Sequence, residues 1–237
     1  MRLHFIVEGQ TEEAFINRVL VPYLTSHEVW GNVRCVMTSK KRKVVYRGGV
    51  ISYTMVKNDI TLWMKEDQNS DVAFTTMFDL YALPSDFPCY DEARKINDVY
   101  KRVEMLEQAI SKDIQHPRFI PYIQLHEFEA LIFADPQKLD WEFFSHDRAI
   151  KSLINMTASV HSPELIDDGN STAPSKRIIQ EIPEYEGMKV SAGPLVVEKI
   201  GLRTLRQKCP HFAQWLEKLE SFNQDVYREK SKINSID

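Results

Sequence analysis

The sequence predicts an α/β fold with a mainly parallel central sheet, and three observations support this prediction. In the first half of the chain, short apolar runs rich in β-branched and aromatic residues alternate with amphipathic stretches. The 237 residues are 43% hydrophobic, which supplies enough apolar surface for a large core. No stretch approaches the roughly 18 apolar residues of a membrane-spanning helix. We therefore expect a globular protein with no membrane partner.

Charge and cysteine content narrow the functional classes further. The formal net charge of -4 excludes a general polycation, so any contact with nucleic acid must come from a local basic patch. Cys35, Cys89 and Cys209 lie far apart, which predicts neither a disulfide scaffold nor a zinc site. The first apolar run becomes charged too soon for a signal peptide. These features predict a cytoplasmic protein.

The strands and helices of the first half can be assigned in order. Strands are expected at residues 3–7, 33–37, 72–78 and 119–125. Thr11 is expected to cap a first helix that Pro22 ends or kinks. A second, less regular helix is expected at about 50–65. The third has an acidic start at Asp91 and Glu92 and apolar residues at steps of three and four as far as Ile114.

The second half of the chain is predicted to be mainly helical. A helical stretch follows the fourth strand and stops near Pro136, and strands fade from about residue 140. A polar loop at 162–177 then separates two further helical segments, the last near 195–219, before a polar tail. The predicted organisation is a Rossmannoid α/β core at 1–138 and a helical extension at 139–237 packed on that core.

Acidic residues follow three of the predicted strands. Glu8 follows the first strand, Asp79 the third, and Glu127 and Glu129 come after His126 at the end of the fourth. In a parallel sheet these ends share one edge, where open α/β folds bind their ligands. Uncompensated carboxylates repel one another, so such a cluster favours a cation, and oxygen-only ligands favour Mg²⁺ or Mn²⁺. Each acid alone is also explained as a helix-start charge, a turn cap or a solvent-facing side chain.

A basic run follows the second predicted strand and predicts a phosphate-binding side. The run, which also contains Gly48 and Gly49, consists of Lys40, Lys41, Arg42, Lys43 and Arg47. Beside a metal centre it would attract a nucleic-acid backbone, although such runs are usually solvated loops. Lys176, Arg177 and His211 are weaker candidates for the same role. His126 is more often a packed histidine than a ligand.

Several motifs together resemble a known family. Val7-Glu8-Gly9 with Gln10-Thr11-Glu12 resembles the first motif of the Toprim domain of topoisomerases, primases and overcoming-lysogenization-defect nucleases. The segments VEGQTE, TTMFDLYALPSDFP, PYIQLHEFEALIF, APSKR and CPHFAQWL, in this order, are similar to an uncharacterised bacterial Toprim-like family found beside ATPase genes in phage-defence and mobile loci.

The resemblance implies a divalent-metal-dependent nuclease with a Toprim-like core. It assigns Glu8 to the metal or to proton transfer, and Asp79 to the first acid of an Asp-x-Asp motif. Tyr81 stands where the second acid belongs, so a ligand is missing unless Glu127 or Glu129 replaces it. Gly9, Glu12, Tyr81 and His126 are expected to border these ligands.

Three functions remain open at this point. The first is a Mg²⁺-dependent nuclease, in bacterial defence with an ATPase partner. The second is a non-catalytic module that binds nucleic acid or docks onto an ATPase, which Tyr81 favours. The third is a phosphatase or nucleotide hydrolase, which would act on a small substrate. The basic run instead favours a polymeric substrate. No glycine-rich nucleotide-binding loop occurs, so any ATPase would be a partner. The choice between DNA and RNA, and whether the chain forms a homodimer, stay open.

Overall fold

The computed structural model describes residues 1–237 except 42–43, 48–49, 51, 167–168, 170–171 and 234–237, and gives only the backbone at 37–41, 44–47, 82 and 223–233. Its central sheet has the order β2-β1-β5-β6, with β7 also on β5, and every pairing within it is parallel. These strands are β1 (Arg2–Val7), β2 (Trp30–Cys35), β5 (Val72–Asp79), β6 (Phe119–Ile120) and β7 (Ile123–Gln124). The predicted α/β class and mainly parallel sheet are confirmed.

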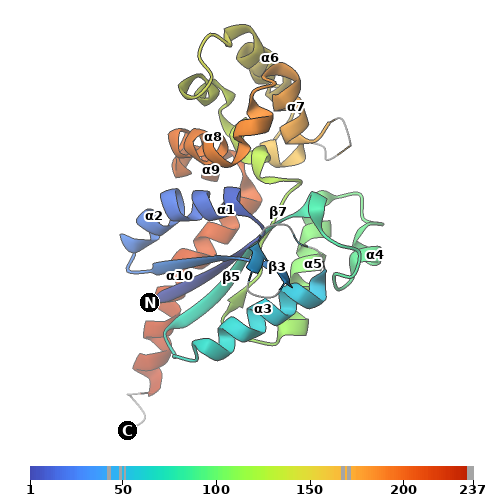
Figure 1. The fold of residues 1–237 in the computed structure, drawn as a ribbon. Helices are drawn as coiled ribbons and strands as arrows, with labels where there is room; N and C mark the ends of the chain where they lie inside the picture. Colours follow the sequence, from blue (N-terminus) through green and yellow to red (C-terminus); the bar gives the residue numbers. More distant parts are fainter. Residues whose placement is uncertain (42–43, 48–49, 51, 167–168, 170–171, 234–237) are drawn as a thin grey trace.

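Alternating side chains of the strands divide the core into two layers. In β1, Leu3, Phe5 and Val7 belong to one hydrophobic cluster, whereas Ile6 belongs to the other. The first cluster lies under α1 (Gln10–Phe15), the π-helical segment Ile16–Leu20 and α10 (Pro210–Ile233). The second lies under α3 (Tyr53–Glu66) and α5 (Val99–Ile114). Figure 1 shows α1 and α3 on opposite sides of the strands.

The first helix differs from the prediction at both ends. Its N-cap is Gly9, and the Glu12 side chain accepts the Gly9 amide, so Thr11 is not the cap. Pro22 does not end the helical run, which continues as α2 (Val21–Thr25). The wider π-helical turns directly before Pro22 accommodate its ring and its missing N–H.

The predicted third helix is two helices. The acidic start forms the short α4 (Tyr90–Ala93), and α5 begins only at Val99. The Asp98 side chain accepts the amides of Tyr100 and Lys101, which makes Asp98 the cap of α5. The Asp98 cap therefore places the start of this helix later than predicted, although its apolar periodicity was predicted correctly.

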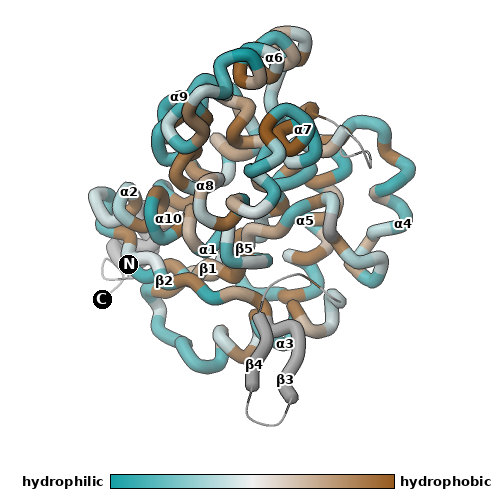
Figure 2. The backbone as a smooth tube through the Cα atoms, turned by 45° about the horizontal axis from the view of Figure 1, so that its top comes forward, coloured by the Kyte–Doolittle hydropathy of each residue, from teal (hydrophilic) through white to brown (hydrophobic). Residues whose placement is uncertain are grey.

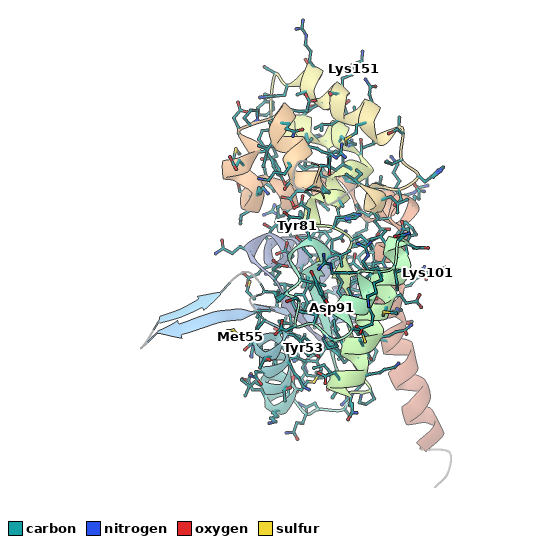
Figure 3. All side chains as sticks on the ribbon, turned by 90° about the vertical axis from the view of Figure 1, so that its right-hand side faces the viewer. Tyr53, Met55, Tyr81, Asp91, Lys101 and Lys151 are labelled. Atoms are coloured by element: carbon teal, nitrogen blue, oxygen red, sulfur yellow. The ribbon has the colours of Figure 1, made fainter. Side chains whose placement is uncertain are left out.

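Two other predicted elements, the fourth strand and the basic run, differ in the structure from the prediction. The fourth strand is interrupted between β6 and β7, where Pro121 lacks an N–H and the Tyr122 amide binds the Thr76 hydroxyl at 2.9 Å. The described part of the basic run forms two antiparallel strands rather than a loop, β3 (Met37–Lys41) and β4 (Val44–Arg47). Figure 3 shows this hairpin extending away from the rest of the molecule.

Helices gather at the end of the sheet where β1 and β5 finish, and we call them the helical cap (Figure 1). After the buried 3-10 segment Phe128–Ala134, the cap comprises 3-10 segments Pro136–Trp141 and Pro163–Leu165 with helices α6 (Asp147–Thr157), α7 (Pro174–Glu181), α8 (Tyr185–Ile200) and α9 (Leu202–Lys208). The helical character predicted after residue 125 is therefore 3-10 in type at first. In Figure 2 the outlying helices α6 and α9 alternate between hydrophobic and hydrophilic colour.

The final helix returns from the cap to the sheet. The segment expected as one helix near 195–219 is divided at Gly201, whose φ is +80°, and again before Pro210. On α10, Trp215 meets Phe5 edge to face at 6.2 Å, and its indole N–H donates to Thr75 at 2.9 Å. The C-terminal helix thus completes the layer that covers β1 and β5. Within the described part of the chain, no helix has the length and apolar character needed to span a membrane.

Candidate functional site

Five carboxyl side chains meet at the edge of the sheet that faces the helical cap, and we call them the acid cluster. They are Glu8, Glu12, Asp79, Glu127 and Glu129. Glu8 directly follows β1 and Asp79 is the last residue of β5, two strands that are adjacent and parallel. The Asp79 amide donates to Glu8 Oε2 at 3.1 Å, which joins the two strand ends. Glu127 and Glu129 arrive from the segment that follows β7.

Electrostatic coupling shows how closely the cluster is packed around Asp79. Burial raises the pKa of Asp79 well above its ordinary range, and the charges of the other four carboxylates raise it further. Burial likewise raises the pKa of Glu8, while the hydrogen bond from the Asp79 amide opposes the shift. Asp79 Oδ1 is buried and finds no hydrogen-bond partner among the described residues. The cluster therefore favours either shared protons or a cation.

Glu12 is a full member of the cluster, which the sequence prediction placed only at its border. Its side chain is 5% exposed, and its Oε2 accepts the Gly9 amide at 2.9 Å. Burial raises the pKa of Glu12 to about 8, with the charges of Glu8 and Glu129 adding to the effect. A Cβ at position 9 would lie 3.3 Å from Glu12 Oε2, so Gly9 permits this close approach. The four-residue spacing between Glu8 and Glu12 was the signal in the sequence that could have identified Glu12. It is easily overlooked, because an acid at a helix start is usually explained by the helix dipole.

The cap supplies polar groups to Glu127 and Glu129. The Ser175 amide, at the start of α7, donates to Glu127 Oε1. On α8, the Tyr185 hydroxyl donates to Glu129 Oε1 at 3.3 Å, and Lys189 Nζ lies 3.8 Å from the same oxygen. Burial raises the pKa of Glu129 to about 7, with a contribution from the Glu127 charge. The site therefore lies between the sheet edge and the cap.

The cluster is not arranged as a finished metal centre. Across the described residues, no group of three or more His, Cys, Asp or Glu side chains is positioned to hold one ion. Backbone amides instead bind the carboxylates of Glu8, Glu12 and Glu127. These side chains would have to turn toward a common point to bind a cation.

Tyr81 and His126 lie on two neighbouring segments at the rim of the cluster. The Tyr81 amide donates to the His126 carbonyl at 2.8 Å, and the Tyr81 side chain is 49% exposed. His126 is 5% exposed and has a φ of +60°. Tyr81 thus turns outward from the position where the resemblance expected a second acid.

The predicted basic residues whose side chains the structure describes lie in different surroundings. Lys176 is exposed, next to Ser175 at the start of α7. Arg177 turns inward, where its Nε donates to the Thr172 carbonyl at 2.6 Å. His211 is paired with Glu107 of α5 at 3.0 Å. Lys40, Lys41 and Arg47 lie on the β3–β4 hairpin, whereas Arg42 and Lys43 are outside the described residues.

Comparison with known proteins identifies a family but attaches no activity to it. Neither curated proteins nor solved structures gave a match to the chain. The family model described as a domain of unknown function, DUF4276, matches residues 7–220, which include the whole acid cluster and the whole helical cap. The chain therefore belongs to the DUF4276 family.

Proposed function

We propose that the protein is a divalent-metal-dependent nuclease with a Toprim-like core, and that the acid cluster is its active site. The observation that carries this proposal is the convergence of five carboxyl groups at the carboxyl edge of a parallel sheet, around an Asp79 oxygen that lacks a partner. Open α/β sheets bind ligands at this edge. Five buried carboxyl groups beside the single ammonium of Lys189 are costly for the folded protein when ionised, which supports a functional reason for keeping them.

The donor set suits Mg²⁺ or Mn²⁺. All five side chains offer oxygen, the ligand that both ions prefer. Asp79 and Glu8 would hold the ion together with Glu12, Glu127 or Glu129, which takes the place of the acid missing at Tyr81. When bound, such an ion polarises a phosphodiester and lowers the pKa of a water molecule.

The protein's own residues would supply the remaining chemistry. Burial raises the pKa of Glu12 to about 8, so Glu12 holds a proton near neutral pH when no cation is present, and binding of a cation by its carboxylate would release that proton to solvent. The Tyr185 hydroxyl and the Lys189 ammonium fix the position of the Glu129 carboxylate. Lys176 and the basic β3–β4 hairpin would attract the phosphate backbone, so binding should weaken as salt rises.

Two measurements test the proposal together. Calorimetric titration with Mn²⁺ should show a site that Glu8→Gln and Asp79→Asn each abolish, and cleavage of plasmid and single strands with Mg²⁺ or Mn²⁺ should be lost in the same variants. Glu186→Gln is the matched control, because it removes an exposed carboxylate from the first turn of α8. Cleavage that both cluster variants retain in full would refute the assignment of the active site.

A second candidate function is supported by a different observation. Tyr81 replaces the second acid, and the cluster is not arranged around one point. Both facts favour a non-catalytic module that binds nucleic acid or docks onto an ATPase. This alternative predicts nucleic-acid or ATPase binding that Glu8→Gln leaves unchanged, and calorimetry that detects no cation site.

A further inference from the structure

Tyr81 presents an aromatic ring at the rim of the acid cluster. It lies in the 3-10 turn Leu80–Ala82, and the flanking Leu80 and Leu83 are buried at 8% and 5% exposure. These two leucines and the hydrogen bond from the Tyr81 amide to His126 fix the backbone of the turn. The Tyr81 side chain is 49% exposed, in contrast to these two buried leucines.

The backbone of Tyr81 lies close to the acid cluster. Tyr81 follows Asp79 by two residues, so their Cα atoms are at most about 7 Å apart. Its partner His126 directly precedes Glu127. Figure 3 places Tyr81 where the helical cap meets the α/β core.

A cavity continues from this rim along the start of α5. It has a volume of about 670 Å³, and His126, Tyr100, Arg102 and Leu165 are among its lining residues. Tyr81 does not line this hollow, but its backbone amide is bonded to the carbonyl of His126, which does. The hollow and the exposed Tyr81 ring are therefore joined through one backbone contact, beside the acid cluster.

An exposed aromatic face recognises a particular state of nucleic acid. Stacking tolerates any base, because every base has a π-face. Within a duplex, however, both faces of each base are already covered by neighbouring bases, so only an unpaired or terminal base can stack on a protein ring. We propose that Tyr81 is a stacking platform for an unpaired base, so that the substrate of the acid cluster is single-stranded nucleic acid or an unpaired region. This inference rests on the proposed nuclease function.

Binding measurements test the inference apart from cleavage. A fluorescently labelled single strand and a blunt duplex of the same sequence are titrated with the full chain, in EDTA and again in Ca²⁺, and anisotropy is recorded. Tyr81→Ala should weaken binding of the single strand by between about 5-fold and about 150-fold and leave duplex binding unchanged. Tyr81→Phe, which keeps the ring, should bind like the original protein.

Trp30→Ala provides the matched control. Trp30 is 52% exposed, but it begins β2 at the opposite end of the sheet, so its loss should not alter binding. Thermal unfolding of each variant confirms that it is folded. Single-strand binding that is equal in Tyr81→Ala and the original protein would overturn the stacking role, while a cation site seen by calorimetry would leave the nuclease proposal standing. If the original protein binds neither nucleic acid, both proposals are wrong.

Discussion

Replacing Glu12 with glutamine should make the metal-free protein more stable at alkaline pH. The side chain is 5% exposed and lies among four other carboxyl groups, so its ionisation in the folded state is costly. Glutamine has nearly the same shape, and its amide oxygen can still accept the Gly9 amide. The substitution therefore removes the buried charge while it keeps the hydrogen bond at the start of α1.

The sign and size of the effect follow from the pKa of Glu12. Burial raises this pKa from an ordinary 4.5 in the unfolded chain to about 8 in the folded protein. The folded protein favours the protonated form of Glu12. The resulting contribution to the unfolding free energy is fully present below pH 4.5 and is lost as pH rises through 8. The difference corresponds to at most about 5 kcal/mol of unfolding free energy above that range, because the neighbouring carboxyls can take up part of the proton. For a chain of this size, this equals at most roughly 10–20 °C in Tm.

Guanidinium unfolding followed by tryptophan fluorescence measures the effect in EDTA. Glu12→Gln and the original protein should have equal unfolding free energies near about pH 4, and the variant should gain progressively up to about pH 9. Glu186→Gln, which removes an exposed carboxylate, should show no such pH dependence. A Glu12→Gln curve parallel to that of the original protein across this range would refute the buried-charge argument.

Three further substitutions test the packing. Glu164 is fully buried, and its carboxylate accepts two backbone amides at the start of α10, so Glu164→Ala should lower Tm by roughly 4–12 °C, whereas the exposed Glu217→Ala should not. A Cβ at Gly31 would lie 2.6 Å from Val21 Cγ2, so Gly31→Ala should cost about 1–3 kcal/mol in denaturant unfolding. Gly187 has open space and lies in α8, so Gly187→Ala should stabilise by about 0.5–1 kcal/mol.

The strand ends could be read from the sequence because they depend on local patterns. The apolar runs that end in Glu8 and Asp79 identify two strands, and their parallel pairing brings the two acids to one edge. Glu12 was harder to recognise, because an acid in the first turn of a helix normally interacts with the helix dipole alone. Only its burial beside Glu8 and Glu129 shows that it belongs to the cluster.

Other features depended on contacts that local pattern does not reveal. The sequence shows a proline at 121 and a potential helix cap at Asp98, but it does not show which groups bind the backbone beside them. The Tyr122 amide, for example, binds a threonine side chain on β5 in place of a regular strand partner. The basic run contains residues compatible with either a loop or a hairpin, and the pairing of β3 with β4 decided between them.

The sequence by itself determined the α/β class, the parallel sheet and the positions of the acids at its strand ends, because alternation and strand length are local properties of the chain. The tertiary structure alone decided which polar groups face those acids. Ser175, Tyr185 and Lys189 come from helices that follow Glu127 by about fifty or more residues, and they reach the cluster only because the cap folds back over the sheet. Burial and electrostatic coupling depend on such distant neighbours, and these two effects set the ionisation of the candidate site.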